Sequence, residues 1–303
     1  MIYDIVILTD CRYENPDKTD WYIEQILLED GLVQSALEKK GLKVIRKSWD
    51  AKDFDWAQSR YAIFRSTWDY FDRFGEFFSW FEKTRKVLEF INFPEIVYWN
   101  LDKHYLNDLK QSNINIPPTI FIEKGEQQSL SALFKKTKWI KAVLKPAIAG
   151  AARETFLIKK EDHLNYEKEL QKLIEKEAML FQEFQYQIQS KGEMSLMMID
   201  GKFTHAVLKK AKPGDFRVQD DFGGTVVDYV PNKEEIAFAE KAIAACPKEI
   251  IYGRVDIFYD NDNRLSLGEL ELIEPELWFR KNPTAADKLA DTIFVQIQHN
   301  ITS

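Results

Sequence analysis

The chain has 303 residues, of which 45% are hydrophobic and 30% are charged, and its formal net charge is −7. This length is enough for two or three packed units, and the composition is typical of a globular protein rather than a disordered one. The net negative charge, which no basic block offsets, argues against a nucleic-acid binder or a membrane-surface binder.

The first 99 residues are predicted to form an N-terminal αβ unit. Strands are expected at Ile5–Leu8, Leu42–Ile45 and Tyr61–Phe64, and helices at Trp21–Lys40 and Phe74–Arg85. This alternation predicts a mainly parallel sheet. No GxGxxG follows the first strand, so a dinucleotide site has no support. The pattern breaks near residue 94, where proline indicates a connection.

Residues 100–180 are predicted to form a second αβ unit. A helix is expected at Leu101–Gln111, and two prolines at 117 and 118 then impose an extended chain. A strand at Ala142–Leu144 and a return strand at Phe156–Ile158 follow. A helix over Glu161–Glu177 would bury a stripe formed by three leucines, namely Leu164, Leu170 and Leu173.

Residues 181–303 are predicted to form a third unit built on two hairpins. Met194–Ile199 and Phe203–Leu208 flank an Asp-Gly pair, which strongly indicates a hairpin turn. A helix follows at Lys233–Ala245. The second hairpin joins Ile251–Tyr259 to Arg264–Leu272, and a helix from Thr284 to Gln298 closes the unit.

The second hairpin carries the acidic residues that are candidates for chemistry. If Asp260 pairs with Asn263, Arg254 lies opposite Glu269, and Asp256 lies diagonally from Glu269 on the face of Glu271 and Leu267. A bulge at Gly268 would shift this register by one residue. Interior carboxylates require a cation, and Mg²⁺ prefers a few carboxylates with phosphate oxygens and water. Ordinary surface acids on an exposed hairpin remain the alternative.

Basic residues occur at suitable places for an anionic ligand. Lys145 ends a strand and precedes a loop of small residues, whose backbone amides can turn toward an oxyanion. Lys103 precedes a helix, and Lys209 ends the first hairpin. Arg217 lies in a glycine-containing loop, which suits a mobile group that clamps a transferring phosphoryl. A lysine at such a place is more often a surface charge than a phosphate ligand, so the order of these residues along the chain carries the interpretation.

That order resembles the ATP-grasp superfamily, and within it the glutathione-synthetase-like branch. The shared succession is strand-Lys-Pro-small loop, Gln-Glu-Phe, a Gly-Glu hairpin, Gly-Asp-Phe-Arg, Gly-Gly, Arg-x-Asp and Glu-x-Glu. The tracts Arg65–Tyr70 and Glu269–Pro275 look most similar to D-cycloserine-forming (O-ureido-serine) cyclo-ligases and their relatives. The resemblance implies an α/β (α+β) ATP-grasp fold. It would have an N-terminal parallel-sheet pre-ATP-grasp domain, a small central αβ subdomain and a C-terminal antiparallel-sheet subdomain.

The resemblance also implies roles for individual residues. It assigns Lys103, Lys145 and Lys209 to the ATP phosphates and Glu193 to the ribose hydroxyls. The hinge that meets adenine, largely through backbone groups, would be Gln182, Glu183 and Phe184. The ligands of Mg²⁺, or alternatively Mn²⁺, would be Asp256, Glu269 and Glu271. Glutathione synthetases carry Asn at the position of Glu271, so this metal site is expected to be more negative than theirs.

Reaction and acceptor residues follow from the same comparison. The predicted catalytic residues are Arg217, Lys209 and Arg254. The predicted substrate residues are Arg65, Trp68 and Asp69. They end an N-terminal strand, where open αβ sheets bind ligands. A packing role for Trp68 and Tyr70 is the competing interpretation.

The resulting hypothesis is an ADP-forming ligase that converts a substrate carboxylate into an acyl phosphate and joins it to an amine. The expected partners are a small amino acid, peptide or ureido-amino acid, with no nucleic acid and no membrane; a homodimer remains open. The alternatives are an intramolecular cyclo-ligase and a non-catalytic nucleotide-binding regulator. The N-terminus lacks a signal-peptide pattern, the two cysteines lack metal-ligand spacing, and no apolar run has the length of a membrane helix. We therefore expect a cytoplasmic protein.

Overall fold

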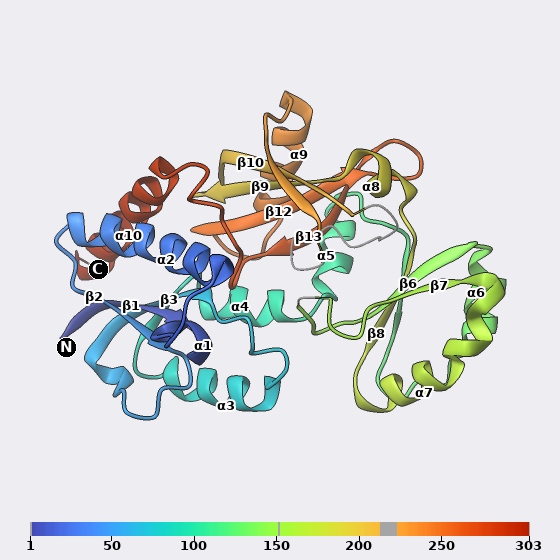
Figure 1. Ribbon diagram of the computed structural model, residues 1–303, viewed down its shortest axis with the longest axis horizontal. Helices are drawn as coiled ribbons and strands as arrows, with labels where there is room; N and C mark the ends of the chain where they lie inside the picture. The colour runs from blue at the N-terminus through green and yellow to red at the C-terminus, as the bar shows by residue number, and fades with distance from the viewer. Residues whose placement is uncertain (1, 151, 213–222, 303) are drawn as a thin grey trace.

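The computed structural model describes residues 2–150, 152–212 and 223–302, and three sheets organise the chain (Figure 1). The N-terminal sheet lies at the left of the view and the central sheet at the right. The C-terminal sheet lies above and between them. The predicted α/β architecture, with a parallel N-terminal sheet and an antiparallel C-terminal sheet, is confirmed, and the central sheet is antiparallel as well.

The N-terminal sheet is parallel throughout, as predicted. Its strands are β1 (Tyr3–Thr9), β2 (Val44–Ser48), β3 (Ser59–Ser66) and β4 (Glu89–Ile91). They are arranged in the order β2-β1-β3-β4. A short helix, α1 (Cys11–Glu14), follows β1, and a 3₁₀ turn at Trp56–Gln58 precedes β3.

Helices cover both faces of this sheet, because successive strand side chains point to opposite sides. Ile5 and Ile7 pack with residues of α2 (Trp21–Lys39) and of α10 (Thr284–Thr302). Val6 and Leu8 pack on the other face with α3 (Phe74–Thr84). The end of the chain therefore completes the core of the N-terminal unit, and Figure 1 shows α10 beside α2.

The connection expected near Pro94 is wrong. Pro94 begins helix α4 (Pro94–Leu101), because proline lacks an amide hydrogen that the first helical turn would leave unpaired. The helix predicted from Leu101 instead begins four residues later, as α5 (Tyr105–Gln111). The short break between α4 and α5 contains Lys103.

The central unit is an antiparallel sheet backed by helices. Its strands are β5 (Thr119–Ile122), β6 (Lys141–Pro146), β7 (Phe156–Lys159) and β8 (Met179–Glu183), in the order β5-β8-β6-β7. The backing helices are α6 (Leu130–Thr137) and α7 (Glu167–Lys176). The helix predicted from Glu161 is wrong in its first turns. These form a 3₁₀ helix, Lys160–Tyr166, and Leu164 is 72% exposed.

The C-terminal sheet contains both predicted hairpins. Its strands are β9 (Glu193–Ile199), β10 (Lys202–Lys210), β11 (Thr225–Tyr229), β12 (Tyr252–Tyr259) and β13 (Leu265–Glu271), in the order β11-β10-β9-β12-β13. The turn residues Asp200 and Gly201 both have positive φ, as a type I′ hairpin requires. Helices α8 (Tyr186–Lys191) and α9 (Lys233–Ala244) flank the sheet, and an Asn232–Glu235 capping box begins α9.

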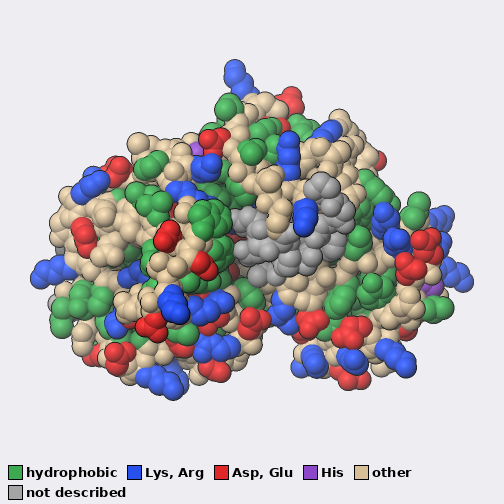
Figure 2. Space-filling view, viewed as in Figure 1, with side chains coloured by type: hydrophobic (Ala, Val, Ile, Leu, Met, Phe, Trp, Pro, Cys, Tyr) green, Lys and Arg blue, Asp and Glu red, His purple; other side chains and the backbone are tan. Residues whose placement is uncertain are grey.

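The described surface agrees with the balanced composition. Figure 2 shows Lys and Arg side chains interspersed with Asp and Glu side chains over the face in view. Within the part of the chain that the structure describes, the helices are too short or too polar to cross a membrane.

Candidate functional site

A cleft of about 250 Å³ lies between the central and C-terminal sheets, and ten of the predicted site residues line it. They are Lys103, Lys145, Gln182, Phe184, Glu193, Lys209, Arg254, Asp256, Glu269 and Glu271. They come from seven separate segments of the chain, so their convergence is a property of the fold and not of sequence proximity. Arg217 lies outside the described residues.

Two predicted phosphate lysines enter the cleft from its central side. Lys103 Nζ donates to the Ala149 carbonyl at 2.5 Å and pairs with Glu269 at 3.0 Å. Lys145 projects from β6, and burial lowers the pKa of its ammonium group. Lys145 forms no ion pair with the described residues, and a buried ammonium without a close anion is unfavourable. This end of the cleft therefore suits an anionic ligand.

The predicted hinge lies where β8 ends. The Gln182 amide donates to Thr119 Oγ1 at 2.9 Å. The backbone amides of Glu183 and Phe184 donate to the carbonyls of Pro118 and Lys141 at 2.9 and 3.2 Å. Those two amides are therefore already hydrogen-bonded within the protein, and of the three hinge residues Gln182 and Phe184 line the cleft.

A buried charge cluster forms the floor of the cleft. Lys209 Nζ lies 2.5 Å from Glu193 and 2.9 Å from Asp256, and the Ser195 hydroxyl donates to Asp256 at 2.6 Å. Although burial opposes the charged form, Arg254 and Lys209 hold the pKa of Asp256 well below its usual range. Burial raises the pKa of Glu193, which shares Lys209 with Asp256.

The register of the β12–β13 hairpin differs from the prediction. Arg254 lies opposite Glu271, not opposite Glu269, and Asp256 lies directly opposite Glu269. The turn shifts the pairing by one residue, since Asp260 pairs with Arg264. The register shifts once more between Asp256 and Ile257, where Gly268 is the extra residue of a bulge.

Glu269 and Glu271 are the cluster's more accessible carboxylates, with side chains 33% and 28% exposed. Glu271 pairs closely with Arg254. Burial, with neighbouring Glu269 and Asp256, nevertheless raises the pKa of Glu271 to about 8. The local cations therefore do not fully compensate the negative charge here, and this donor set fits a hard divalent cation.

Asp256 fits such a cation less well in this arrangement. Both of its oxygens accept hydrogen bonds, one from Ser195 and Arg254 and the other from Lys209 and Arg254. Within residues 2–150, 152–212 and 223–302, no group of three or more His, Cys, Asp or Glu side chains is arranged to hold a metal ion. A three-carboxylate site would require Lys209 or Arg254 to move away from Asp256.

Side chains from outside the sheet hold the outer edge of β13, and no motif in the sequence predicts them. The Asn100 carboxamide donates to the Leu270 carbonyl and accepts from the Leu272 amide, both at 2.8 Å. Tyr105 Oη accepts from the Leu270 amide at 3.0 Å. Because Leu270 and Leu272 flank Glu271, these contacts fix the position of that carboxylate.

A second space of about 370 Å³, which we call the side cavity, adjoins the cleft. Lys103, Lys209, Arg254, Glu269 and Glu271 line both, so the two spaces share one charged wall. The remaining walls are largely aromatic and come mainly from the N-terminal unit. They include Tyr13, Tyr22, Trp68, Tyr70, Phe71 and Trp278.

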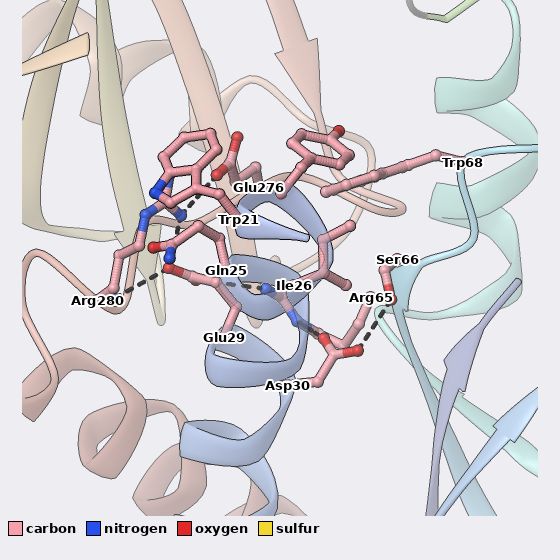
Figure 3. A pocket seen from close by; sticks show the side chains of 11 residues that line it. Trp21, Gln25, Ile26, Glu29, Asp30, Arg65, Ser66, Trp68, Glu276 and Arg280 are labelled. Atoms are coloured by element: carbon pink, nitrogen blue, oxygen red, sulfur yellow. Dashed lines mark hydrogen bonds and ion pairs between the residues drawn. The ribbon is translucent and has the colours of Figure 1, made fainter. Parts of the chain in front are cut away.

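The three predicted substrate residues have different surroundings. Trp68 lines the side cavity and donates through Nε1 to the Glu274 carbonyl at 2.9 Å. Arg65 is buried, donates to the Pro275 carbonyl at 3.1 Å, and lines a smaller pocket beside α2 (Figure 3). Asp69 accepts from Trp49 at 2.7 Å and pairs with Arg73 at 2.5 Å, and it lines neither the cleft nor the side cavity.

The smaller pocket shows how the segment after β13 is fastened. Arg280 pairs with Glu29 of α2 at 2.9 Å and with Glu276 at 2.6 Å, and both contacts are drawn in Figure 3. Arg65 lies 3.7 Å from Asp30 in the same network. Arg65 therefore joins the N-terminal unit to this segment.

Two family profiles match successive parts of the chain. The profile of the RimK-like ATP-grasp domain matches residues 102–271. The profile of the N-terminal domain of D-cycloserine synthetase DcsG matches residues 5–92. The first match contains all of the predicted cofactor and metal positions, and the second contains the three predicted substrate positions.

Individual relatives match most of the chain. The cycloserine biosynthesis protein DcsG of Streptomyces lavendulae is 25% identical over 249 residues, which cover 76% of this chain and 80% of that protein. The crystal structure of D-cycloserine synthetase DcsG matches with a TM-score of 0.82 and 22% identity, over 95% of this chain and 98% of that one. D-alanine–D-alanine ligase from Bacillus anthracis matches with a TM-score of 0.65 and 16% identity, over 98% and 99%. The predicted ATP-grasp fold is confirmed.

Proposed function

The chain belongs to the RimK-like ATP-grasp family, and from that premise we propose that it activates the carboxylate of a small amino acid, peptide or ureido-amino acid. It is an ATP-dependent, ADP-forming carboxylate–amine ligase. The non-catalytic regulator is therefore not retained. The cytoplasmic location, the absence of nucleic-acid and membrane partners and the homodimer stay predictions.

The shared wall of the cleft and the side cavity is the observation that carries this proposal. The nucleotide occupies the cleft, with its phosphates at Lys103, Lys145 and Lys209. The carboxylate substrate occupies the side cavity beside Trp68. A transferring phosphoryl group then has a short path from one space to the other along the shared wall.

The remaining nucleotide contacts follow the predicted roles. Gln182, Glu183 and Phe184 lie at the adenine end, and Glu193 receives the ribose hydroxyls. Glu269 and Glu271 would hold the divalent cation, and Asp256 would join them as a third ligand if Lys209 or Arg254 turned away. When bound, Mg²⁺ supplies charge neutralisation and orientation of the phosphates.

The reaction balances in two steps. A carboxylate oxygen attacks the γ-phosphorus, and the bond to the ADP oxygen breaks, giving an acyl phosphate. The amine nitrogen then attacks the acyl carbon, and the carbon–oxygen bond to phosphate breaks with loss of one amine proton. Amine attack gives a tetrahedral intermediate that carries an oxyanion until phosphate leaves. Arg254, which lines both spaces, stabilises that oxyanion. Arg217 has the same proposed role from outside the described residues.

An intramolecular cyclo-ligase is the second candidate. The DcsG N-terminal profile covers Tyr13, Tyr22, Trp68 and Tyr70, and these residues line the side cavity. A substrate that carries both the carboxylate and the amine would fill this cavity alone. Arg65 and Asp69 keep their proposed part in the acceptor site as supports of the wall near Trp68.

ADP release and product mass test these proposals. Single D- and L-amino acids, O-ureido-serine and dipeptides are assayed with ATP and Mg²⁺, first alone and then in pairs. A product equal to one compound minus water identifies the cyclo-ligase, and a product equal to two compounds minus water identifies intermolecular ligation. If enzyme that binds ATP releases no substrate-dependent ADP with any of these compounds, the proposed substrate class is wrong.

A further inference from the structure

The side cavity contains one carboxylate whose role the reaction above does not explain. Glu274 follows β13 and lines the cavity. The other carboxylates there have cationic partners: Glu269 pairs with Lys103, Glu271 with Arg254, and Glu276 with Arg280. Among the described residues, Glu274 forms no such ion pair.

The contacts of Glu274 are with Tyr70 and Trp68, while Lys103 acts on its carboxylate from a longer distance and lowers its pKa. The Tyr70 hydroxyl hydrogen-bonds its carboxylate, and the Trp68 indole donates to its backbone carbonyl at 2.9 Å. Tyr13 and Tyr22 pack against Trp68, and their ring centroids lie 6.2 and 6.4 Å from that of Trp68. Burial raises the pKa of Glu274 to about 7, so its negative charge is poorly compensated in the ligand-free chain.

We propose that Glu274 binds the ammonium group of the carboxylate substrate, with Tyr70 orienting it and Trp68 forming the adjacent wall. A carboxylate among aromatic rings is a favourable environment for a cation, since the ring faces attract positive charge as well. The inference rests on the proposed function and narrows it. The substrate is a free amino acid or amino-acid derivative, and not a simple or N-acylated carboxylic acid.

Position supports this assignment. Glu274 lies three residues beyond Glu271, on the same segment that forms the charged wall. In an α-amino acid, a single carbon separates the ammonium group from the carboxylate. An ammonium held at Glu274 therefore keeps the carboxylate within the side cavity, toward the wall that contains Lys209 and Arg254.

Hydroxylamine provides an assay that needs only the carboxylate substrate. Its nitrogen attacks the acyl carbon of the acyl phosphate, phosphate leaves, and the hydroxamate is measured. Each amino acid of the panel is compared with its N-acetyl derivative and with the acid that lacks the amine. We expect the wild-type protein to prefer the free amine by about 10- to 100-fold in kcat/KM, because hydrogen bonds to charged groups contribute that much.

The variant Glu274→Gln keeps the size and removes the charge. It should lose that preference, mainly through KM for the amino acid, with the KM for ATP unchanged. Glu274→Asp keeps the charge and should retain part of the preference. Glu82→Gln, which removes a carboxylate on α3 that lines neither space, should behave as wild type. Thermal melting and ATP binding verify that each variant folds.

The outcomes are distinguishable. If the best wild-type substrate lacks an amine, or if Glu274→Gln keeps the preference and loses only kcat, the ammonium site is refuted while the ligase proposal stands. A Glu274→Gln protein that fails to fold leaves the decision to the wild-type preference and to Glu274→Asp. If no compound gives a hydroxamate with the wild-type protein, the proposed function fails, and the ammonium site fails with it.

Discussion

Removal of the Asn100 side chain tests whether α4 positions the carboxylates of β13. Asn100 is 9% exposed, and its carboxamide makes two hydrogen bonds of 2.8 Å to the backbone on either side of Glu271. Asn100→Ala leaves one backbone carbonyl and one backbone amide without these partners. Each unsatisfied buried group costs about 1–3 kcal/mol.

The two losses sum to about 2–6 kcal/mol in the free energy of unfolding. Asn100 also lines the side cavity, so water can replace part of the lost bonding. We therefore expect about 2–4 kcal/mol. Loss of the hydrogen bonds on either side of Glu271 should also lower kcat for ADP release by about 10- to 100-fold, because small misplacements of reacting groups have effects of this size.

Urea unfolding followed by tryptophan fluorescence measures the first effect, and ADP release over a Mg²⁺ titration measures the second. Asn107→Ala is the matched control, because Asn107 lies on α5 and its side chain forms no hydrogen bond with any of the described residues. If Asn100→Ala is destabilised no more than Asn107→Ala, the edge bonds do not hold β13. An unchanged kcat with an unchanged Mg²⁺ dependence would show that Asn100 does not position the carboxylates of β13.

Three further changes probe the site and the fold. Glu271→Gln should lower ADP release by more than about 100-fold with an unchanged urea midpoint, since a ligand matters at least as much as its supports; unchanged turnover would remove Glu271 from the metal set. Burial lowers the pKa of His205 in the folded protein, so as pH falls the unfolded chain binds a proton at this residue before the folded chain does. Stability should therefore fall as pH drops below about 6.5. His205→Gln, which can still donate to the Leu277 carbonyl, should lose less stability between pH 7.5 and 5.5 than wild type in urea titrations, and an identical loss contradicts the assignment. Gly192→Ala should cost about 2 kcal/mol or more, because φ is +85° and the new Cβ meets the Lys209 carbonyl at 2.6 Å, whereas Gly31→Ala, in open space on α2, should stabilise the chain by about 0.5–1 kcal/mol.

Local patterns in the sequence predicted most of the elements, because those patterns report burial. The alternation in β1 places Ile5 and Ile7 against one helix layer and Val6 and Leu8 against the other. Pro94 shows where such patterns are ambiguous, because the same residue type that ends one helix is favourable in the first turn of the next.

The motifs predict which residues gather in the cleft, but they do not predict the residues that tertiary contacts add to it. Lys103 and Glu269 are 166 positions apart, yet the order of motifs placed them in one site, and they pair at 3.0 Å. Asn100 and Glu274 belong to no such motif. Their importance depends on which groups surround them, and a buried asparagine or a cavity carboxylate has no signature along the chain.

The bulge at Gly268 determines which side chains of β13 face the cleft and which face the core. Strict alternation from Leu267 would place Glu269 in the core and Leu270 in the cleft. The extra residue exchanges the faces to which the following side chains point. Leu267, Leu270 and Leu272 therefore all pack in one hydrophobic cluster, while Glu269 and Glu271 face the cleft. A Cβ at position 268 would lie 2.8 Å from the Phe258 ring, so glycine permits the bulge at this contact. The carboxylates reach the cleft, and the leucines the core, only because the strand is irregular between them.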